Sequence, residues 1–172
     1  MGEKQTQRRF AVMGKNTFTI ANRIMKNQTI CRLLKYPARD ALAKDENGNY
    51  KYPAVDGAEL INKQILIVPK IYDDSNDKMS YITAIFDDFT VNILNPEFKV
   101  STIRFDIACP YDEWRLDEPS LRPYLIMQEI DNMFNQEELA GIGNLQFWRA
   151  DALTLSPWIG GYSMRYKINE FN

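Results

Sequence analysis

The residues with the greatest potential for chemistry are two pairs of adjacent acidic residues, Asp87-Asp88 and Asp112-Glu113. Neighbouring carboxylates can act as a general acid and a general base, or they can bind a divalent cation. A site of this kind needs at least two of the four side chains to converge in one pocket, and sequence spacing neither shows nor excludes that. A metal-dependent enzyme is therefore the least favoured of the three functional hypotheses that the sequence supports.

Other residue types that commonly carry catalysis are scarce. The chain of 172 residues contains no histidine, which excludes His-containing triads and the commonest metal ligand. Cys31 and Cys109 lie in apolar stretches with no visible histidine or cationic activator, so we predict two buried, reduced thiols. We therefore predict that the protein is not an enzyme and has no catalytic residue, no metal site and no cofactor.

Composition points to an ordinary globular protein. The chain has 21 basic and 23 acidic residues, a formal net charge of −2, and a hydrophobic content of 45%. This balance gives no global attraction to nucleic acid or to an anionic membrane, although a local basic patch is left open. No apolar run approaches the ~18–20 residues that a membrane helix needs, so we expect no membrane association.

The elements that must position any functional residue centre on residues 98–133. Apolar side chains occupy every second position from Ile103 to Cys109, which predicts a strand with one buried and one exposed face. From Ser120 onward the apolar spacing changes to three and four residues and continues to Phe134. This spacing predicts an amphipathic helix that covers a sheet face.

Weaker patterns complete the predicted fold. We expect helices over residues 16–26, capped by Asn16 or Thr17, and over 30–35. We expect strands over residues 65–68, 81–86, 89–94, 145–149 and 162–168, with Asp87-Asp88 as a hairpin turn.

The predicted architecture is one α+β domain over residues 16–172, an antiparallel sheet with helices packed on one face. Residues 1–15 are expected to form a flexible, extended N-terminal arm. Residues 38–58 are expected to form a long projecting loop or hairpin around the turn signal Asn47-Gly48.

Three places in the sequence are candidates for contact with a partner. The arm carries Arg8, Arg9 and Phe10, and the projecting loop carries Tyr50 and Tyr52 near its tip. The third is Trp158, in a tight loop before a pair of glycines. Aromatic and arginine side chains are enriched in protein interfaces, so we predict an interface role for these six residues.

The order of elements and several short motifs resemble neck proteins of tailed bacteriophages, of the tail-terminator and head–tail joining type. The motifs are Ile103-x-Phe105-x-Ile107, Arg122-Pro123, the helix to Phe134, Gly141-Ile142-Gly143, and Gly160-Gly161-Tyr162-Ser163-Met164-x-Tyr166. The resemblance covers roughly residues 60–168. It implies a non-catalytic virion protein, assembled in the host cytoplasm as a homo-oligomeric ring between portal or connector and tail proteins, with nucleic acid only in a central channel.

An accessory binding module for nucleic acid or protein is the alternative hypothesis. It would act through Arg8-Arg9 and through stacking on exposed aromatic rings such as Tyr50 and Tyr52. Salt-dependent binding to DNA distinguishes this hypothesis from the structural one.

Overall fold

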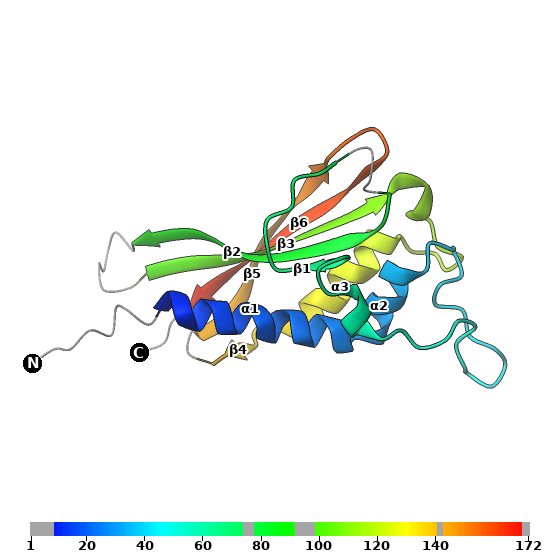
Figure 1. Ribbon diagram of the computed structural model, residues 1–172, viewed down its shortest axis with the longest axis horizontal. Coiled ribbons are helices and arrows are strands. Elements are labelled where there is room, and N and C mark those ends of the chain that lie inside the picture. Colours follow the sequence, from blue (N-terminus) through cyan, green and yellow to red (C-terminus); the bar gives the residue numbers. More distant parts are fainter. Residues whose placement is uncertain (1–8, 74–77, 92–98, 141–142, 170–172) are drawn as a thin grey trace, which may run out of the picture.

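The computed structural model describes residues 9–73, 78–91, 99–140 and 143–169, and these contain three α-helices and one six-stranded sheet (Figure 1). The sheet has the strand order β1-β2-β3-β6-β5-β4. Along the chain the elements are α1 (Arg9–Lys26), α2 (Gln28–Lys35), the 3-10 helix η2 (Gly57–Leu60), β1 (Ile65–Leu66), β2 (Tyr81–Val91), β3 (Lys99–Pro110), the 3-10 helix η3 (Tyr111–Glu113), α3 (Arg122–Phe134), β4 (Glu138–Leu139), β5 (Gly143–Thr154) and β6 (Ile159–Asn169).

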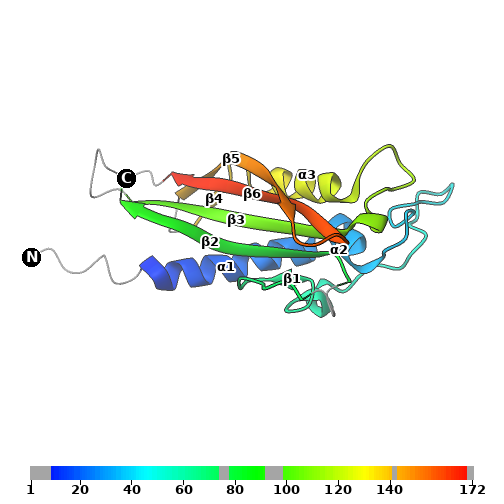
Figure 2. The same ribbon diagram turned by 90° about the horizontal axis from the view of Figure 1, so that it is seen from above.

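The helices α1, α2 and α3 pack on one face of the sheet, and the opposite face carries no helix of the described residues (Figures 1 and 2). The predicted α+β class with helices on one face is therefore confirmed. The main hydrophobic core lies between the two layers and draws side chains from all three helices and from the four long strands.

The central strand and helix form as the apolar spacing predicts. In β3 the side chains of Ile103, Phe105 and Ile107 are fully buried toward the helices, and α3 buries Ile126, Ile130 and Phe134. The rings of Phe105 and Phe134 stack with their centroids 5.2 Å apart, which joins the strand directly to the helix.

The sheet is mixed rather than wholly antiparallel. The edge strand β1 pairs with β2 in parallel, through Ile65 opposite Ile82 and Leu66 opposite Thr83. This part of the prediction is wrong because a strand's partner and direction depend on the path of the intervening chain, which the alternation of apolar residues does not encode.

The predicted turn at Asp87-Asp88 is also wrong. Strand β2 continues through both residues to Val91, and its pairing with β3 shifts register between Asp87 and Thr90. Asp88 has φ +50°, the left-handed conformation that Asp tolerates both in turns and in β-bulges. The connection from β2 to β3 includes residues 92–98, which lie outside the described residues.

The N-terminal prediction needs two corrections. Helix α1 begins at Arg9, so the extended arm predicted for residues 1–15 is helical from Arg9 onward, while residues 1–8 lie outside the described part. Asn16 does not cap a helix, because it is buried within α1, where its Nδ2 donates to Val12 O and to Ala140 O, each at 3.0 Å. The second bond holds α1 against the chain that follows β4.

The predicted loop of residues 38–58 projects from the body around its turn (Figure 1), whereas Ala41 and Val55 are buried in the core and residues 57–58 belong to η2. Lys44 and Tyr50 form an isolated antiparallel bridge across the turn, and Gly48 adopts φ +82°, a conformation that favours glycine. Hydrogen bonds to Asp45 Oδ1 from the backbone N–H groups of Asn47 and Asn49, at 2.9 and 2.8 Å, close the tip.

Arg122, the first residue of α3, is fully buried and joins four parts of the chain. Its guanidinium donates to the carbonyl oxygens of Glu113 (2.8 Å), Tyr36 (2.8 Å), Pro37 (2.9 Å) and Ala38 (2.9 Å), and also to that of Leu33. Because the carbonyls at a helix C-terminus lack partners within the helix, this cation also caps α2.

Candidate interaction surfaces

An open pocket of about 870 Å³ lies at the end of the sheet where β3 ends and β6 begins. Its lining combines aromatic, proline and charged side chains: Tyr72, Lys78, Pro110, Tyr111, Asp112, Glu113, Pro157, Trp158 and Ile159. The side chain of Trp158 is 71% exposed and that of Tyr111 is 39% exposed. Trp158 is therefore exposed and lines a concave site, and its role as an interface residue stays a prediction.

The backbone around Trp158 is fixed although its ring is exposed. Trp158 N donates to Ser156 Oγ at 3.1 Å, and Trp158 O accepts from Tyr111 N at 2.9 Å. A Cβ on Gly160 would overlap the Tyr111 hydroxyl, so only glycine allows this ring to lie against β6. The exposed aromatic side chain is thus presented by a rigid support.

Two of the four carboxylates considered for catalysis, Asp112 and Glu113, line this pocket together with Lys78. Burial raises the pKa of Glu113, while the positive charge of Arg122 and a 3.2 Å hydrogen bond from Ser80 Oγ to Glu113 Oε2 act in the opposite direction. Among the described residues, no group of three or more His, Cys, Asp or Glu side chains is arranged to hold a metal ion.

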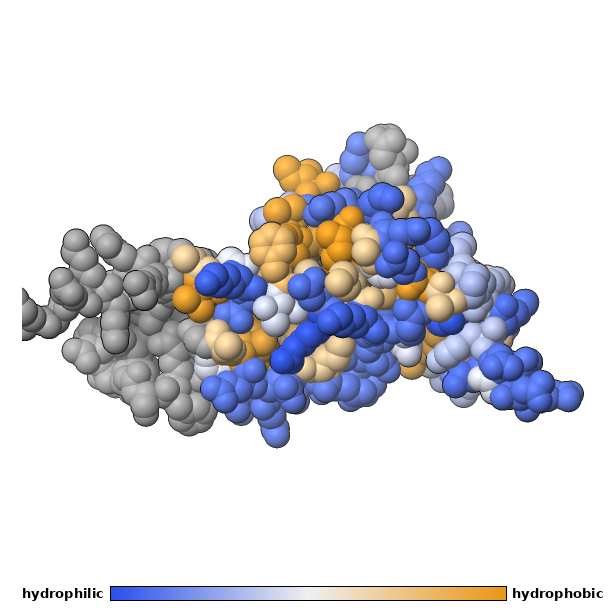
Figure 3. Space-filling model, turned by 60° about the horizontal axis from the view of Figure 1, so that its bottom comes forward, coloured by the Kyte–Doolittle hydropathy of each residue, from blue (hydrophilic) through white to orange (hydrophobic). Residues whose placement is uncertain are grey.

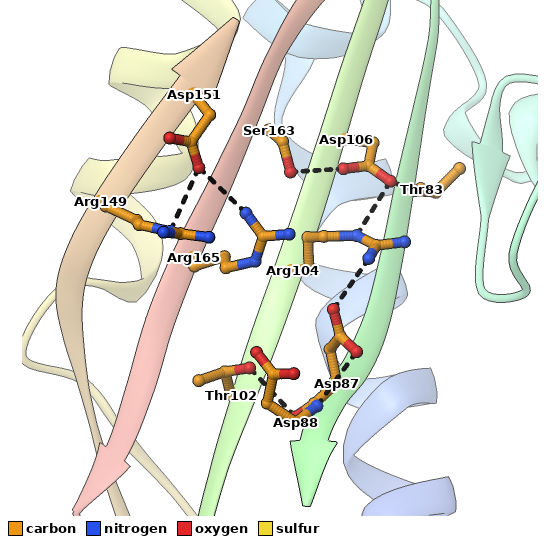
Figure 4. Close-up of polar contacts among 10 residues, drawn as sticks. All are labelled: Thr83, Asp87, Asp88, Thr102, Arg104, Asp106, Arg149, Asp151, Ser163 and Arg165. Carbon is orange, nitrogen blue, oxygen red and sulfur yellow. Dashed lines mark hydrogen bonds and ion pairs between the residues drawn. The ribbon is translucent and has the colours of Figure 1, made fainter. Parts of the chain in front are cut away.

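Asp87 and Asp88 contribute to a different surface, the sheet face that carries no helix (Figure 4). Arg104 Nη1 contacts Asp87 Oδ2 at 2.8 Å, and Arg104 Nε contacts Asp106 Oδ2 at 3.1 Å. Ser163 Oγ donates to Asp106 Oδ1 at 2.7 Å. The carboxylates of Asp87 and Asp106 therefore both balance the positive charge of Arg104.

The same face continues across β6 and β5 with a second group of charges (Figure 4). Asp151 Oδ2 lies 3.1 Å from Arg165 Nη1 and 3.1 Å from Arg149 Nε. In the pairing registers Arg104, Arg165 and Arg149 lie directly opposite one another across three strands. Because like charges at opposite positions repel, the acidic side chains between the arginines stabilise this arrangement.

Tyr50 and Tyr52 are half-buried and pack against the chain around α2. The Arg32 guanidinium lies 4.0 Å from the centroid of the Tyr50 ring. Tyr52 stacks on Tyr36 at 4.8 Å and donates to Asp40 Oδ1 at 2.8 Å. In Figure 3 the projecting end of the loop is hydrophilic, so its aromatic residues serve to fasten the loop to the body.

The other predicted contact residues are at the N-terminus. Arg8 lies outside the described residues, and of Arg9 and Phe10 only the backbone is described, as the start of α1. Their role as interface residues stays a prediction.

The open edge of strand β5 is the feature that sequence analysis missed. Residues 146–152 are all exposed. On the side away from β6, β4 pairs with Gly143 and Asn144, and the chain before β4 bonds to Leu145 and to Phe147 N, so the open part of the edge begins after Phe147. Alternation in residues 145–149 predicted the strand, but only the three-dimensional arrangement shows that it forms an open edge.

These features define a class of protein: an α+β domain whose described surface offers an aromatic pocket, a charge-balanced sheet face and an open strand edge. Residues 27–168 match the model of the YomW family, and the chain belongs to this phage-derived family. The match extends from the start of α2 to the end of β6 and so includes all of these surfaces. Comparison with curated proteins and with solved structures gives no match. No helix of the described residues is long and apolar enough to cross a membrane.

Proposed function

We propose that this phage-associated protein is a non-catalytic structural subunit of a tailed-phage virion that forms a ring at the head–tail junction. Family membership supports a phage role, and the resemblance of residues 60–168 to neck proteins supports the position in the particle. In this role the protein acts through contacts with further copies of itself and with portal, connector or tail proteins.

The aromatic pocket around Trp158 is the observation that carries this proposal. A tryptophan that is 71% exposed leaves a large apolar surface in water. Burial of an aromatic side chain removes ~150–250 Å² from water, and Trp and Tyr are common energetic centres of interfaces. Tyr111 and Pro157 line the same pocket. A partner protein that covers this end of the sheet would bury the whole group.

Native mass spectrometry and negative-stain imaging of the full-length protein test the ring. We expect closed rings, either from the protein alone or after addition of the portal or tail proteins of the same phage. A protein that stays monomeric in the presence of all these partners would contradict the proposal.

Substitution at the pocket tests the surface that meets the partner. Trp158→Ala should weaken attachment of the neighbouring neck or tail protein by about 30-fold or more, because an interface tryptophan contributes ≥ ~2 kcal/mol. Phe18→Ala is a matched control, since Phe18 is 61% exposed on α1. Equal loss of attachment in both variants, or no loss in either, would show that the pocket is not the contact surface.

A further inference from the structure

Strand β5 has the properties of a sheet edge that another strand completes. Among the described residues, no backbone hydrogen bond of residues 148–154 leads anywhere except to β6. Residues 146–152 are exposed, so the strand is also little covered on its two faces. Long exposed edges of this kind present a row of N–H and C=O groups that pair readily with a further strand.

A second open edge lies on the opposite side of the same sheet. Of the described residues of β2, strand β1 covers only Ile82 and Thr83. Beyond these two residues β2 continues to Val91 with no neighbouring strand on that side among the described residues. The sheet thus has two different open edges, β5 on one side and β2 on the other, which is what a head-to-tail interface between identical subunits requires.

The strand directions of the two edges match. Going from β2 to β3, β6 and β5, each strand is antiparallel to the one before it. Three reversals make β5 antiparallel to β2. A second copy placed beside the first in the same orientation therefore brings its β2 next to β5 as an antiparallel neighbour, and the sheet continues without a change of pattern.

We propose that residues 148–152 of β5 in one copy pair with residues 84–88 of β2 in the next, with Arg149 opposite Asp87. The inference rests on the proposed function, because the second copy is the neighbouring subunit of the ring. It names the surface through which copies join side by side and leaves the pocket at Trp158 free for a different protein.

Charge and register select this alignment. Within one sheet, Arg149 of β5 pairs with Arg165 of β6, which pairs with Arg104 of β3, which in turn pairs with Ile85 of β2. A second copy placed without any shift would therefore bring its Ile85 opposite Arg149. A shift of two residues places Arg149 opposite Asp87 of the second copy, so that opposite charges face each other. The shift also keeps the paired residues of the two copies away from the part of β2 that β1 covers. Closure of strands into a barrel-like ring requires a stagger of this kind.

Disulfide trapping between two singly substituted proteins tests the alignment. Asp87→Cys protein is mixed with Arg149→Cys protein under mild oxidation, and covalent dimers are measured. Residues directly opposite each other have Cβ atoms ~4.5–5.5 Å apart, close enough for a disulfide to form after a small adjustment. The natural thiols Cys31 and Cys109 are buried and do not compete.

The matched control is a mixture of Asp87→Cys and Asp151→Cys proteins. Asp151 lies on the same face of β5, two residues further along, so it is out of register with Asp87. We expect at least about tenfold more dimer from the 87 and 149 mixture than from the 87 and 151 mixture. Equal yields, or no dimer in either mixture, would overturn the proposed alignment.

A charge exchange supplies an independent test. Arg149→Asp places like charges across the joint and should weaken self-association by about tenfold in analytical ultracentrifugation. The double variant Arg149→Asp, Asp87→Arg should recover most of that loss, although each residue also has a partner within its own chain. Failure of the double variant to associate better than Arg149→Asp, with unchanged circular dichroism, would contradict the inference.

These experiments separate the inference from the proposed function. If rings form but the crosslink between positions 87 and 149 does not, the edge pairing is overturned and the proposed function still stands. The crosslink in dimers or open chains that never close, even with portal and tail proteins present, would support the edge pairing and overturn the ring at the head–tail junction.

Discussion

Replacement of Arg122 by methionine tests whether one buried cation holds the helical layer together. Methionine keeps the length and apolar volume of the side chain but removes all of its donors. In the native fold these donors bind five carbonyl oxygens, of residues 33, 36, 37, 38 and 113. The substitution leaves the C-terminus of α2 and the chain after it without partners.

The expected loss follows from the burial of the site. An unsatisfied buried carbonyl costs ~1–3 kcal/mol, and the total for five carbonyls stays below their sum because some of them can turn toward water or find other donors. We expect Arg122→Met to lower the free energy of unfolding by about 4 kcal/mol. For a chain of this length that lowers the melting temperature by about 8–16 °C.

Urea unfolding followed by tryptophan fluorescence and circular dichroism measures this loss. With a slope of about 2 kcal/mol/M, the midpoint should fall by about 2 M. Arg122→Lys should lose about half as much, since an ammonium has three donors for five acceptors. Arg115→Met, at an exposed position of the same segment, is the control and should change stability by less than about 0.5 kcal/mol. An Arg122→Met midpoint within about 0.3 M of wild type, at equal slope, would refute the argument.

Two further predictions concern the sheet and the thiols. A Cβ at position 161 would overlap the carbonyl oxygen of Ile107, so Gly161→Ala should destabilise the protein by about 3 kcal/mol in urea unfolding. Gly14→Ala, in open space on α1, should stabilise it by about 0.5–1 kcal/mol. Burial raises the pKa of Cys31 to about 11 and of Cys109 to about 12, so both thiols should react with a disulfide reagent at pH 8 far more slowly in native than in unfolded protein. Native thiols that react as fast as free cysteine would contradict this prediction. Because the folded state holds the thiols neutral while the unfolded state ionises them, the free energy of unfolding should decline as the pH rises above about 9.

The parts of the fold that sequence predicted best are those set by local periodicity. Alternation around Phe105 gives β3, and three- and four-residue spacing up to Phe134 gives α3, because each element buries one continuous face. The start of α1 was missed because the turns before Asn16 are stabilised by tertiary packing, with Met13 buried and Val12 against the core. Such contacts leave no local signal.

The error at Asp87-Asp88 has a different physical origin. Aspartate favours turns because it accepts a left-handed backbone, and the bulge in β2 uses that same property at Asp88. Residue type alone therefore cannot separate a strand that turns from a strand that bulges. The difference lies in the partner strand β3, which extends the ladder past the irregularity.

For the candidate surfaces, the sequence identified single residues but not the neighbours with which they form a surface. Trp158 was recognisable from its place in a tight loop, whereas its companions Tyr111 and Tyr72 come from segments far away in the chain. The open edges of β2 and β5 depend on the strand order of the whole sheet, which no single segment encodes. Arg122 was noticed only as part of a motif, and its burial shows why an arginine is needed there.

The projecting loop offers a convenient insertion point for a reporter. Hydrogen bonds to Asp45 close the tip of the loop, and the stack of Tyr36 on Tyr52 holds its base. The tip and the base are therefore held by different contacts. Extra residues placed between Asn47 and Gly48 would lengthen an exposed turn at small entropic cost. An epitope or fluorophore there would mark where each subunit sits in an intact particle, at a distance from the strands and the pocket.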